Sequence, residues 1–258
     1  MKITDIETIP VSLPVGKFED GQDKVGGRDT PSRYDAGKSA KRRHVGDADS
    51  TRYLSNVIVK IHTDEGLTGI GEAACDTTEP VRNVRDMIDR HMKPQLVGQD
   101  PLDWEYLIDL VSWDAPRGAT RFATTGIDLA LHDLVAKRFG VPVYNLIGGQ
   151  RRTRLLASIE VPRNTPEKMV EHSYEYFKAG VRGIKAKIGS NPELDAESIK
   201  EIRKKLGPDV SIRADANRGY TVKEAITFCR LVERYDADLE VLEQPVGTLD
   251  IEGTKAVR

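Results

Sequence analysis

The chain has 258 residues, and its 39 Lys and Arg residues nearly balance 41 Asp and Glu residues, giving a formal net charge of -2 at pH 7. Hydrophobic residues make up 38% and charged residues 31%, as in an ordinary globular protein. No apolar run approaches the roughly 18 residues that a membrane span needs, and the chain lacks the basic surplus typical of nucleic-acid-binding proteins. Asp5 and Glu7 stand where a secretory signal would be apolar, so we expect a cytoplasmic protein.

The N-terminal part is predicted to be an α+β domain. Alternating residues predict a strand over 2–13, and residues 56–73 predict two strands joined by the turn Asp64-Glu65-Gly66. Helical periodicity then follows over three segments: 79–92, 101–111 and 119–138. The pair Gly148-Gly149 precedes a change of pattern, so we place the domain boundary there and expect this domain to cover residues 1–149.

The remaining residues, 150–258, repeat a β/α pattern. Four short apolar segments predict strands: 154–160, 182–188, 210–214 and 239–243. The first three are each followed by a helical segment: 166–179, 192–205 and 221–235. This alternation predicts an α/β fold with parallel strands and right-handed crossovers, as in the first half of a (β/α) barrel. Four strands cannot close an eight-stranded barrel, and the sequence stops at Arg258 inside a fourth helix. We therefore expect a fragment, or the ordered part, of a longer protein, with an open four-stranded sheet as the alternative.

Three chemically active residues recur at the strand ends with a constant spacing. Lys187, Asp215 and Glu243 stand 28 positions apart twice over, each at the carboxyl end of its predicted strand. In a (β/α) barrel, catalytic groups gather at that end.

The segment Gly183–Ile188 carries two lysines in alternation. Lys185 and Lys187 fall on one face of the predicted strand and the apolar residues on the other. The two ammonium groups would then point into the barrel. The alternative is an exposed edge strand whose lysines protect against aggregation.

Asp215 and Glu243 would lie on neighbouring strands about 4.8 Å apart. Two carboxylates at that separation repel each other, and a hard divalent cation such as Mg²⁺ resolves the repulsion. Alternatively, Asp215 caps the next helix or pairs with Arg213, and Glu243 pairs with a lysine. A lysine must lower its ordinary pKa of about 10.4 by roughly 3 units to act as a base near neutrality. Neighbouring positive charge acts in that direction, so Lys187 is the candidate base.

Several motifs carry a family resemblance along nearly the whole chain. They are the opening KITDIETIPVSLP, the hairpin end GLTGIGEA, the segment TGIDLALHDLVAKRFGVPVYNLIGG, and then IKAKIG, RADANRGY and LEQPV. The sequence resembles the mandelate racemase/muconate lactonizing enzyme group of the enolase superfamily. Its Lys-x-Lys motif and Glu-Gln-Pro look more like the muconate-lactonizing branch.

The resemblance implies an N-terminal α+β capping domain over a modified TIM barrel, of which about four βα units are present. It implies Lys187 as the base, Lys185 as its electrostatic partner, and Asp215 and Glu243 as Mg²⁺ ligands. Asn217 would bind substrate or lie near the metal. The third carboxylate ligand and the second acid/base of such enzymes would lie beyond Arg258.

Two loops of the capping domain, about 15–52 and 74–80, contribute to specificity in this family. Basic residues in the first could hold an anionic distal group of the substrate: Arg33, Lys38, Lys41, Arg42 and Arg43. The alternative is a solvated loop.

The leading hypothesis is a Mg²⁺-dependent isomerase that removes the α-proton of a small-molecule carboxylate substrate through an enediolate, giving racemisation, epimerisation or cycloisomerisation. The alternatives are an acid-sugar or hydroxy-acid dehydratase, a Schiff-base aldolase using Lys185 or Lys187, and a truncated non-catalytic assembly module. By resemblance, we also expect a homo-oligomer.

Overall fold

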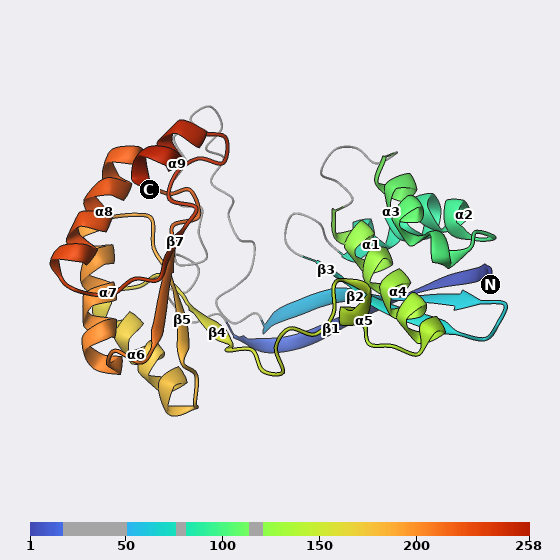
Figure 1. Ribbon diagram of the computed structural model, residues 1–258, viewed down its shortest axis with the longest axis horizontal. Coiled ribbons are helices and arrows are strands. Elements are labelled where there is room, and N and C mark those ends of the chain that lie inside the picture. Colours follow the sequence, from blue (N-terminus) through green and yellow to red (C-terminus); the bar gives the residue numbers. More distant parts are fainter. Residues whose placement is uncertain (18–50, 76–80, 114–120) are drawn as a thin grey trace. The chain divides into compact units, whose positions relative to one another are not determined.

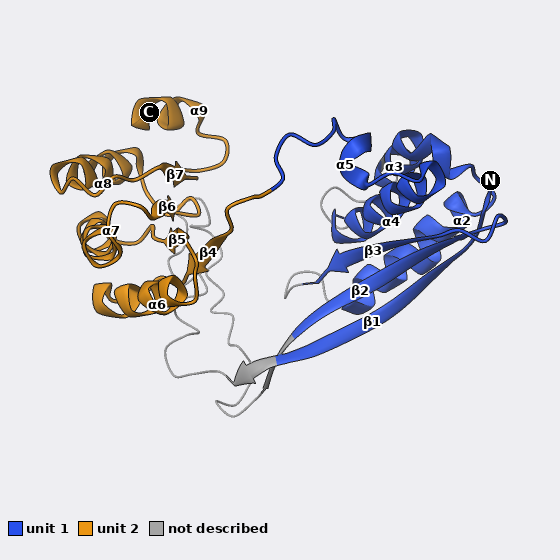
Figure 2. Ribbon diagram, turned by 60° about the horizontal axis from the view of Figure 1, so that its bottom comes forward, with its two compact units in different colours: residues 1–17, 49–153 blue, residues 18–48, 154–258 orange. Residues whose placement is uncertain are grey.

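The structure is a computed structural model that describes residues 1–17, 51–75, 81–113 and 121–258 (Figure 1). The chain divides into two compact units, and among the described residues the division falls between Thr153 and Arg154 (Figure 2). Within the described residues, no helix combines the length and the apolar character needed to cross a membrane.

The N-terminal unit contains an antiparallel three-stranded sheet in the order β1-β2-β3. Its strands are β1 (Ile3–Lys17), β2 (Thr51–Thr63) and β3 (Thr68–Ala74). Alternation places Val57, Val59 and Ile61 on the buried face of β2. The predicted hairpin turn is confirmed, and Gly66 takes the left-handed backbone conformation there (φ 80°). β1 runs past Pro14, and it is an edge strand, where proline is tolerated.

The helices of this unit are α1 (Val81–Met87), the π-helix η3 (Ile88–Met92), α2 (Lys93–Leu96), the 3-10 helix η4 (Pro101–Asp103), α3 (Trp104–Trp113), α4 (Arg121–Phe139) and α5 (Val143–Leu146). Of these, α4 packs on β2 and β3, and α1 contacts β1 and β2. Close packing of α4 on β3 depends on glycine: a Cβ at Gly71 would lie 2.1 Å from the carbonyl oxygen of Gly126. The short helix α5 was not predicted.

The C-terminal unit contains a parallel four-stranded sheet in the order β4-β5-β6-β7. Its strands are β4 (Ser158–Val161), β5 (Gly183–Lys187), β6 (Ser211–Asp215) and β7 (Val241–Glu243). Its helices are α6 (Pro166–Lys178), α7 (Pro192–Leu206), α8 (Val222–Arg234) and α9 (Ile251–Val257). Figures 1 and 2 show α6, α7 and α8 on the same side of the sheet. Each strand is followed by a helix, so the predicted α/β fold with four βα units is confirmed.

The core of this unit lies between the sheet and its helices. Apolar strand residues such as Ile184, Ala186 and Ile212 are fully buried against helix residues that include Ile199 and Phe228. The prediction was wrong at the start of β4, which was expected at residue 154. The strand begins only at Ser158, because the exposed residues before it do not pair with β5.

Candidate functional site

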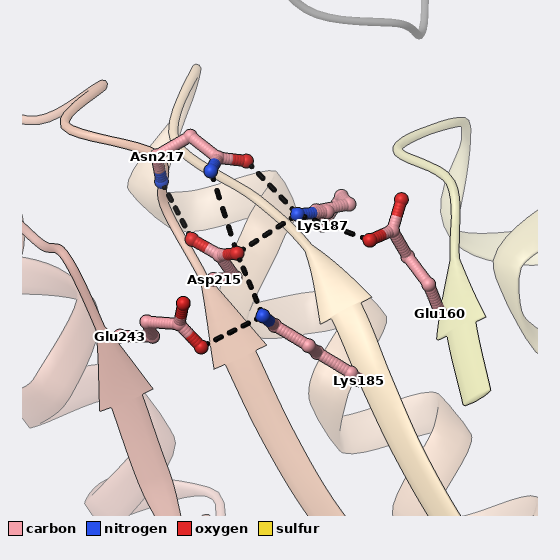
Figure 3. A network of polar contacts seen from close by, with 6 residues as sticks. All are labelled: Glu160, Lys185, Lys187, Asp215, Asn217 and Glu243. Carbon is pink, nitrogen blue, oxygen red and sulfur yellow. Dashed lines mark hydrogen bonds and ion pairs between the residues drawn. The ribbon is translucent and has the colours of Figure 1, made fainter. Parts of the chain in front are cut away.

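The two lysines of β5 project from the face of the sheet opposite the helices. Ile184 and Ala186, which alternate with them, are fully buried in the core. The side chains of Lys185 and Lys187 are 28% and 20% exposed and point toward the same group of polar residues (Figure 3). The lysines therefore lie half-buried among acids rather than on a solvated edge.

Strand register explains the constant spacing of the candidate residues. Lys187 on β5 pairs with Asp215 on β6, and Asp215 pairs with Glu243 on β7. A parallel sheet places residues of one register level side by side. The structure thus brings together the three residues that the sequence spaced evenly.

Asp215 lies at the centre of the cluster, and only 1% of its surface is exposed. Its Oδ2 atom is 2.8 Å from Lys187 Nζ and 3.0 Å from Lys185 Nζ. Burial raises the pKa of Asp215, but hydrogen bonds from Lys187, the Asn217 backbone and Lys185 outweigh it and hold the pKa below its usual value. The carboxylate is therefore held in its ionised form.

Lys185 lies between the two predicted metal ligands. Its Nζ atom is 2.7 Å from Glu243 Oε2 as well as 3.0 Å from Asp215 Oδ2. The hydrogen bond to Glu243 is the largest cause that raises the pKa of Lys185, and burial opposes it. Asp215 and Glu243 can therefore share one positive charge.

Asn217 contacts both ends of the Asp215–Lys187 ion pair. Its backbone N–H donates to Asp215 Oδ1 at 2.9 Å, and its side-chain Oδ1 accepts from Lys187 Nζ at 3.2 Å. Asn217 and Arg218 both have positive φ, 44° and 68°. Non-glycine residues reach this region at some energetic cost, and such strain is often found at functional sites.

Glu160 belongs to the same network, and the sequence analysis did not single it out. It lies on β4, and its Oε2 atom is 3.1 Å from Lys187 Nζ (Figure 3). Its side chain is 56% exposed. The sequence could have indicated Glu160, because it is a charged residue at the end of the first predicted strand. It does not follow the spacing of 28 residues that relates Lys187, Asp215 and Glu243.

The structure tests the alternative roles that the sequence left open for Asp215 and Glu243. Arg213 pairs with Glu240 at 2.8 Å, and Thr221 caps α8, so neither alternative role of Asp215 applies. The alternative for Glu243 does hold here, because it pairs with Lys185.

The donor set suits a hard cation. Asp215 and Glu243 offer carboxylate oxygens, which Mg²⁺ prefers, and the ammonium group of Lys185 already bridges them. In the part of the chain that the structure describes, no group of three or more His, Cys, Asp or Glu side chains is arranged to hold a metal ion. Because a metal site usually has more than two protein ligands, Asp215 and Glu243 fit as one part of such a site.

The five basic residues of the predicted specificity loop, from Arg33 to Arg43, lie outside the described residues.

Two sequence models of known families match successive parts of the chain. The model described as "Mandelate racemase / muconate lactonizing enzyme, N-terminal domain" matches residues 42–148. The model described as "Enolase C-terminal domain-like" matches residues 168–258. The chain belongs to the mandelate racemase/muconate lactonizing enzyme group of the enolase superfamily. The family resemblance noted in the sequence is confirmed.

Curated proteins to which the chain is similar include epimerases and racemases. The L-Ala-D/L-Glu epimerase of Clostridium acetobutylicum is 36% identical over 211 residues, which are 81% of this chain and 58% of that protein. The N-succinyl-L-Arg/Lys racemase of Bacillus cereus is 30% identical over 208 residues, 80% of this chain and 56% of that protein.

The chain is also similar in structure to solved epimerases. A substrate-liganded complex of the L-Ala-D/L-Glu epimerase from Bacillus subtilis matches with a TM-score of 0.80 and 30% identity. A dipeptide epimerase from Enterococcus faecalis, complexed with Mg and the dipeptide L-Leu-L-Tyr, matches with a TM-score of 0.78 and 26% identity. Each match covers 100% of this chain and 65% of the other chain. The chain thus spans less than two thirds of the length of these relatives.

Proposed function

We propose that this protein is a Mg²⁺-dependent enzyme that removes the α-proton of a small-molecule carboxylate substrate and gives racemised or epimerised product through an enediolate. The observation that carries the proposal is the common register of Lys187, Asp215 and Glu243 on three adjacent strands. The relatives named epimerase or racemase support the reaction type.

Lys187 is the proposed base. It lies half-buried within hydrogen-bonding distance of three oxygen acceptors, on Glu160, Asp215 and Asn217. Lys185 lies two residues earlier on the same face of β5 and adds positive charge there. Its ammonium group contacts both Asp215 and Glu243. Asn217 is proposed to bind substrate or orient the ammonium group of Lys187.

Asp215 and Glu243 are the proposed Mg²⁺ ligands. When bound, the ion would neutralise the negative charge that develops on the substrate carboxylate as the α-proton leaves. The family resemblance implies a third carboxylate ligand on a later strand. Sequencing the gene past the codon for Arg258 tests this, because a carboxylate about 25 residues after Glu243, at a strand end, is expected from the similar spacing of 28 residues between Asp215 and Glu243. If the gene encodes no such residue, a non-catalytic assembly module becomes the better reading.

Loss of the base is the direct test of the reaction. The product of the complete gene is incubated in deuterated water with Mg²⁺ and a panel of dipeptides, N-acyl amino acids, proline derivatives and sugar acids. Exchange at the α-carbon is followed by NMR. Lys187→Ala should lower the exchange rate by about 100-fold to 10,000-fold, the usual contribution of a positioned acid or base. Lys178→Ala is the matched control, because Lys178 lies on α6 and pairs with Glu175. Exchange that survives in Lys187→Ala removes the base assignment.

Dehydration is the second candidate reaction, and a relative favours it. The arabinonate dehydratase of Saccharolobus solfataricus is 32% identical over 205 residues, 74% of this chain and 52% of that protein. Loss of a β-hydroxyl after α-proton removal would give a 2-keto acid from a sugar acid. Assaying the same panel for 2-keto acid release separates the two outcomes.

A Schiff-base mechanism would leave Asp215 and Glu243 without a role, and borohydride trapping of a substrate adduct on a lysine tests it.

A further inference from the structure

Asp195 is a buried carboxylate that the proposed chemistry does not use. It lies in the first turn of α7 and is 4% exposed. Its Oδ2 atom accepts hydrogen bonds from three successive backbone N–H groups of the loop after β5: Gly189 at 3.0 Å, Ser190 at 3.1 Å and Asn191 at 3.1 Å. The loop that directly follows Lys187 is therefore tied to this one carboxylate.

The same oxygen also holds the next loop of the sheet. The hydroxyl group of Tyr220, in the loop between β6 and α8, donates to Asp195 Oδ2 at 2.6 Å. Tyr220 is 5% exposed, and burial together with the charge of Asp195 raises the pKa of the Tyr220 hydroxyl. An acid that served only the helix dipole of α7 would need no donor from another loop.

The two loops also touch through their backbones. A Cβ at Gly219 would lie 2.1 Å from the carbonyl oxygen of Gly189, and a Cβ at Gly189 would lie 2.3 Å from the carbonyl oxygen of Ala216. The loop after β6 carries Asn217, whose Oδ1 is 3.2 Å from Lys187 Nζ. The contact between Lys187 and Asn217 thus joins the same two segments that Asp195 holds together.

We propose that Asp195 is a positioning residue, which fixes the loop after β5 against the loop after β6 and so sets the geometry of Lys187 and Asn217. This inference rests on the proposed function, because it assigns Lys187 a role in α-proton removal. A shift of about 1 Å in a reacting group can cost on the order of 100-fold in rate. Asp195 would therefore affect turnover more than substrate binding.

The test compares three variants in the α-proton exchange assay. Asp195→Asn keeps the size of the side chain but removes its charge and replaces an acceptor by a donor. We expect kcat to fall by about 10-fold to 100-fold, as for residues that orient catalytic groups, with KM changed less than about threefold. Tyr220→Phe removes one of the four donors and should lower kcat less, by roughly threefold to tenfold.

Arg203→Lys is the matched control for lost stability. Arg203 also lies on α7, but its guanidinium group donates to backbone carbonyls at the opposite ends of the strands: Gly207, Pro208, Val210, Ala237 and Asp238. This variant should lower the urea midpoint and leave kcat unchanged. If Asp195→Asn reduces kcat no more than Arg203→Lys at a similar loss of stability, Asp195 is only structural and the inference fails.

Amide hydrogen exchange keeps the test independent of the reaction. If the wild-type protein exchanges no substrate α-proton, the proposed function fails, and the loops are compared by mass spectrometry instead. Asp195→Asn should lose protection in residues 189–191 and also in residues 216–220, whereas Arg203→Lys should keep it in both. Loss confined to 189–191 shows that Asp195 does not couple the loops and overturns the inference.

Discussion

In the N-terminal unit, Glu7 and Lys60 pair across β1 and β2 at 3.4 Å, with side chains 46% and 34% exposed. In the C-terminal unit, Asp215 contacts two lysines at 2.8 Å and 3.0 Å and is 1% exposed. Both arrangements are ion pairs between neighbouring strands. The antiparallel sheet has a solvated face for its charges, whereas the parallel sheet holds Asp215 and its two lysines together toward the carboxyl ends of its strands.

The difference in burial changes what each ion pair contributes to the stability of the fold. An exposed ion pair contributes about 0–1 kcal/mol to stability. A buried carboxylate loses hydration, and its ion pairs often do no more than offset that loss. Stability alone therefore does not account for Asp215 and its two lysines, whereas the proposed cation site and base would.

We expect the largest effect from removing the charge of the buried acid, Asp215. Asp215→Asn should weaken Mg²⁺ binding, measured by calorimetry on the product of the complete gene, by about 100-fold, equal to ~2.7 kcal/mol. Glu240→Gln is the control, because Glu240 precedes β7 at the other end of the sheet and pairs with Arg213. Mg²⁺ binding that is equally weakened by both variants would argue against a site at Asp215.

In the N-terminal unit the largest effect should come from packing. Gly71→Ala should lower the free energy of unfolding by about 2–3 kcal/mol, because its Cβ would overlap the carbonyl oxygen of Gly126. Gly66→Ala tests backbone strain alone, since Gly66 has φ 80° and nothing lies within 4 Å of its Cβ position; roughly 1 kcal/mol is expected. Equal urea midpoints for the two variants would contradict the overlap.

Acid should weaken the C-terminal unit through Asp215. Its pKa is lowered in the folded state, so its contribution to stability is complete above the unfolded value of about 3.9 and is lost as pH falls through the folded value. Urea unfolding of the metal-free protein between about pH 5 and pH 3 should show this loss. Asp215→Asn should show a shallower dependence on pH, and an unchanged slope would speak against the lowered pKa.

The smallest effect should come from the exposed pair of the N-terminal unit. Glu7→Gln removes the ion pair with Lys60 and the contact with His62 and should change the free energy of unfolding by less than about 1 kcal/mol. Thermal unfolding at low and high salt measures it. A larger, salt-independent loss would place Glu7 in the same class as Asp215.

Local patterns in the sequence were enough for the βα order and for four residues of the candidate site. Alternation along β5 put Lys185 and Lys187 on one face, and the even spacing put Asp215 and Glu243 at the ends of the next two strands. Both patterns follow from the period of two along a strand and from the nearly constant length of a βα unit. The roles assigned to these residues stay predictions.

Only the tertiary structure decided which charges meet. It paired Arg213 with Glu240 rather than Asp215, brought Glu160 to Lys187, and placed Asp195 between two loops. It also showed that residues 154–157 do not join β4. Such contacts depend on side-chain conformation and on how separate loops approach in space, and neither leaves a periodic trace along the chain.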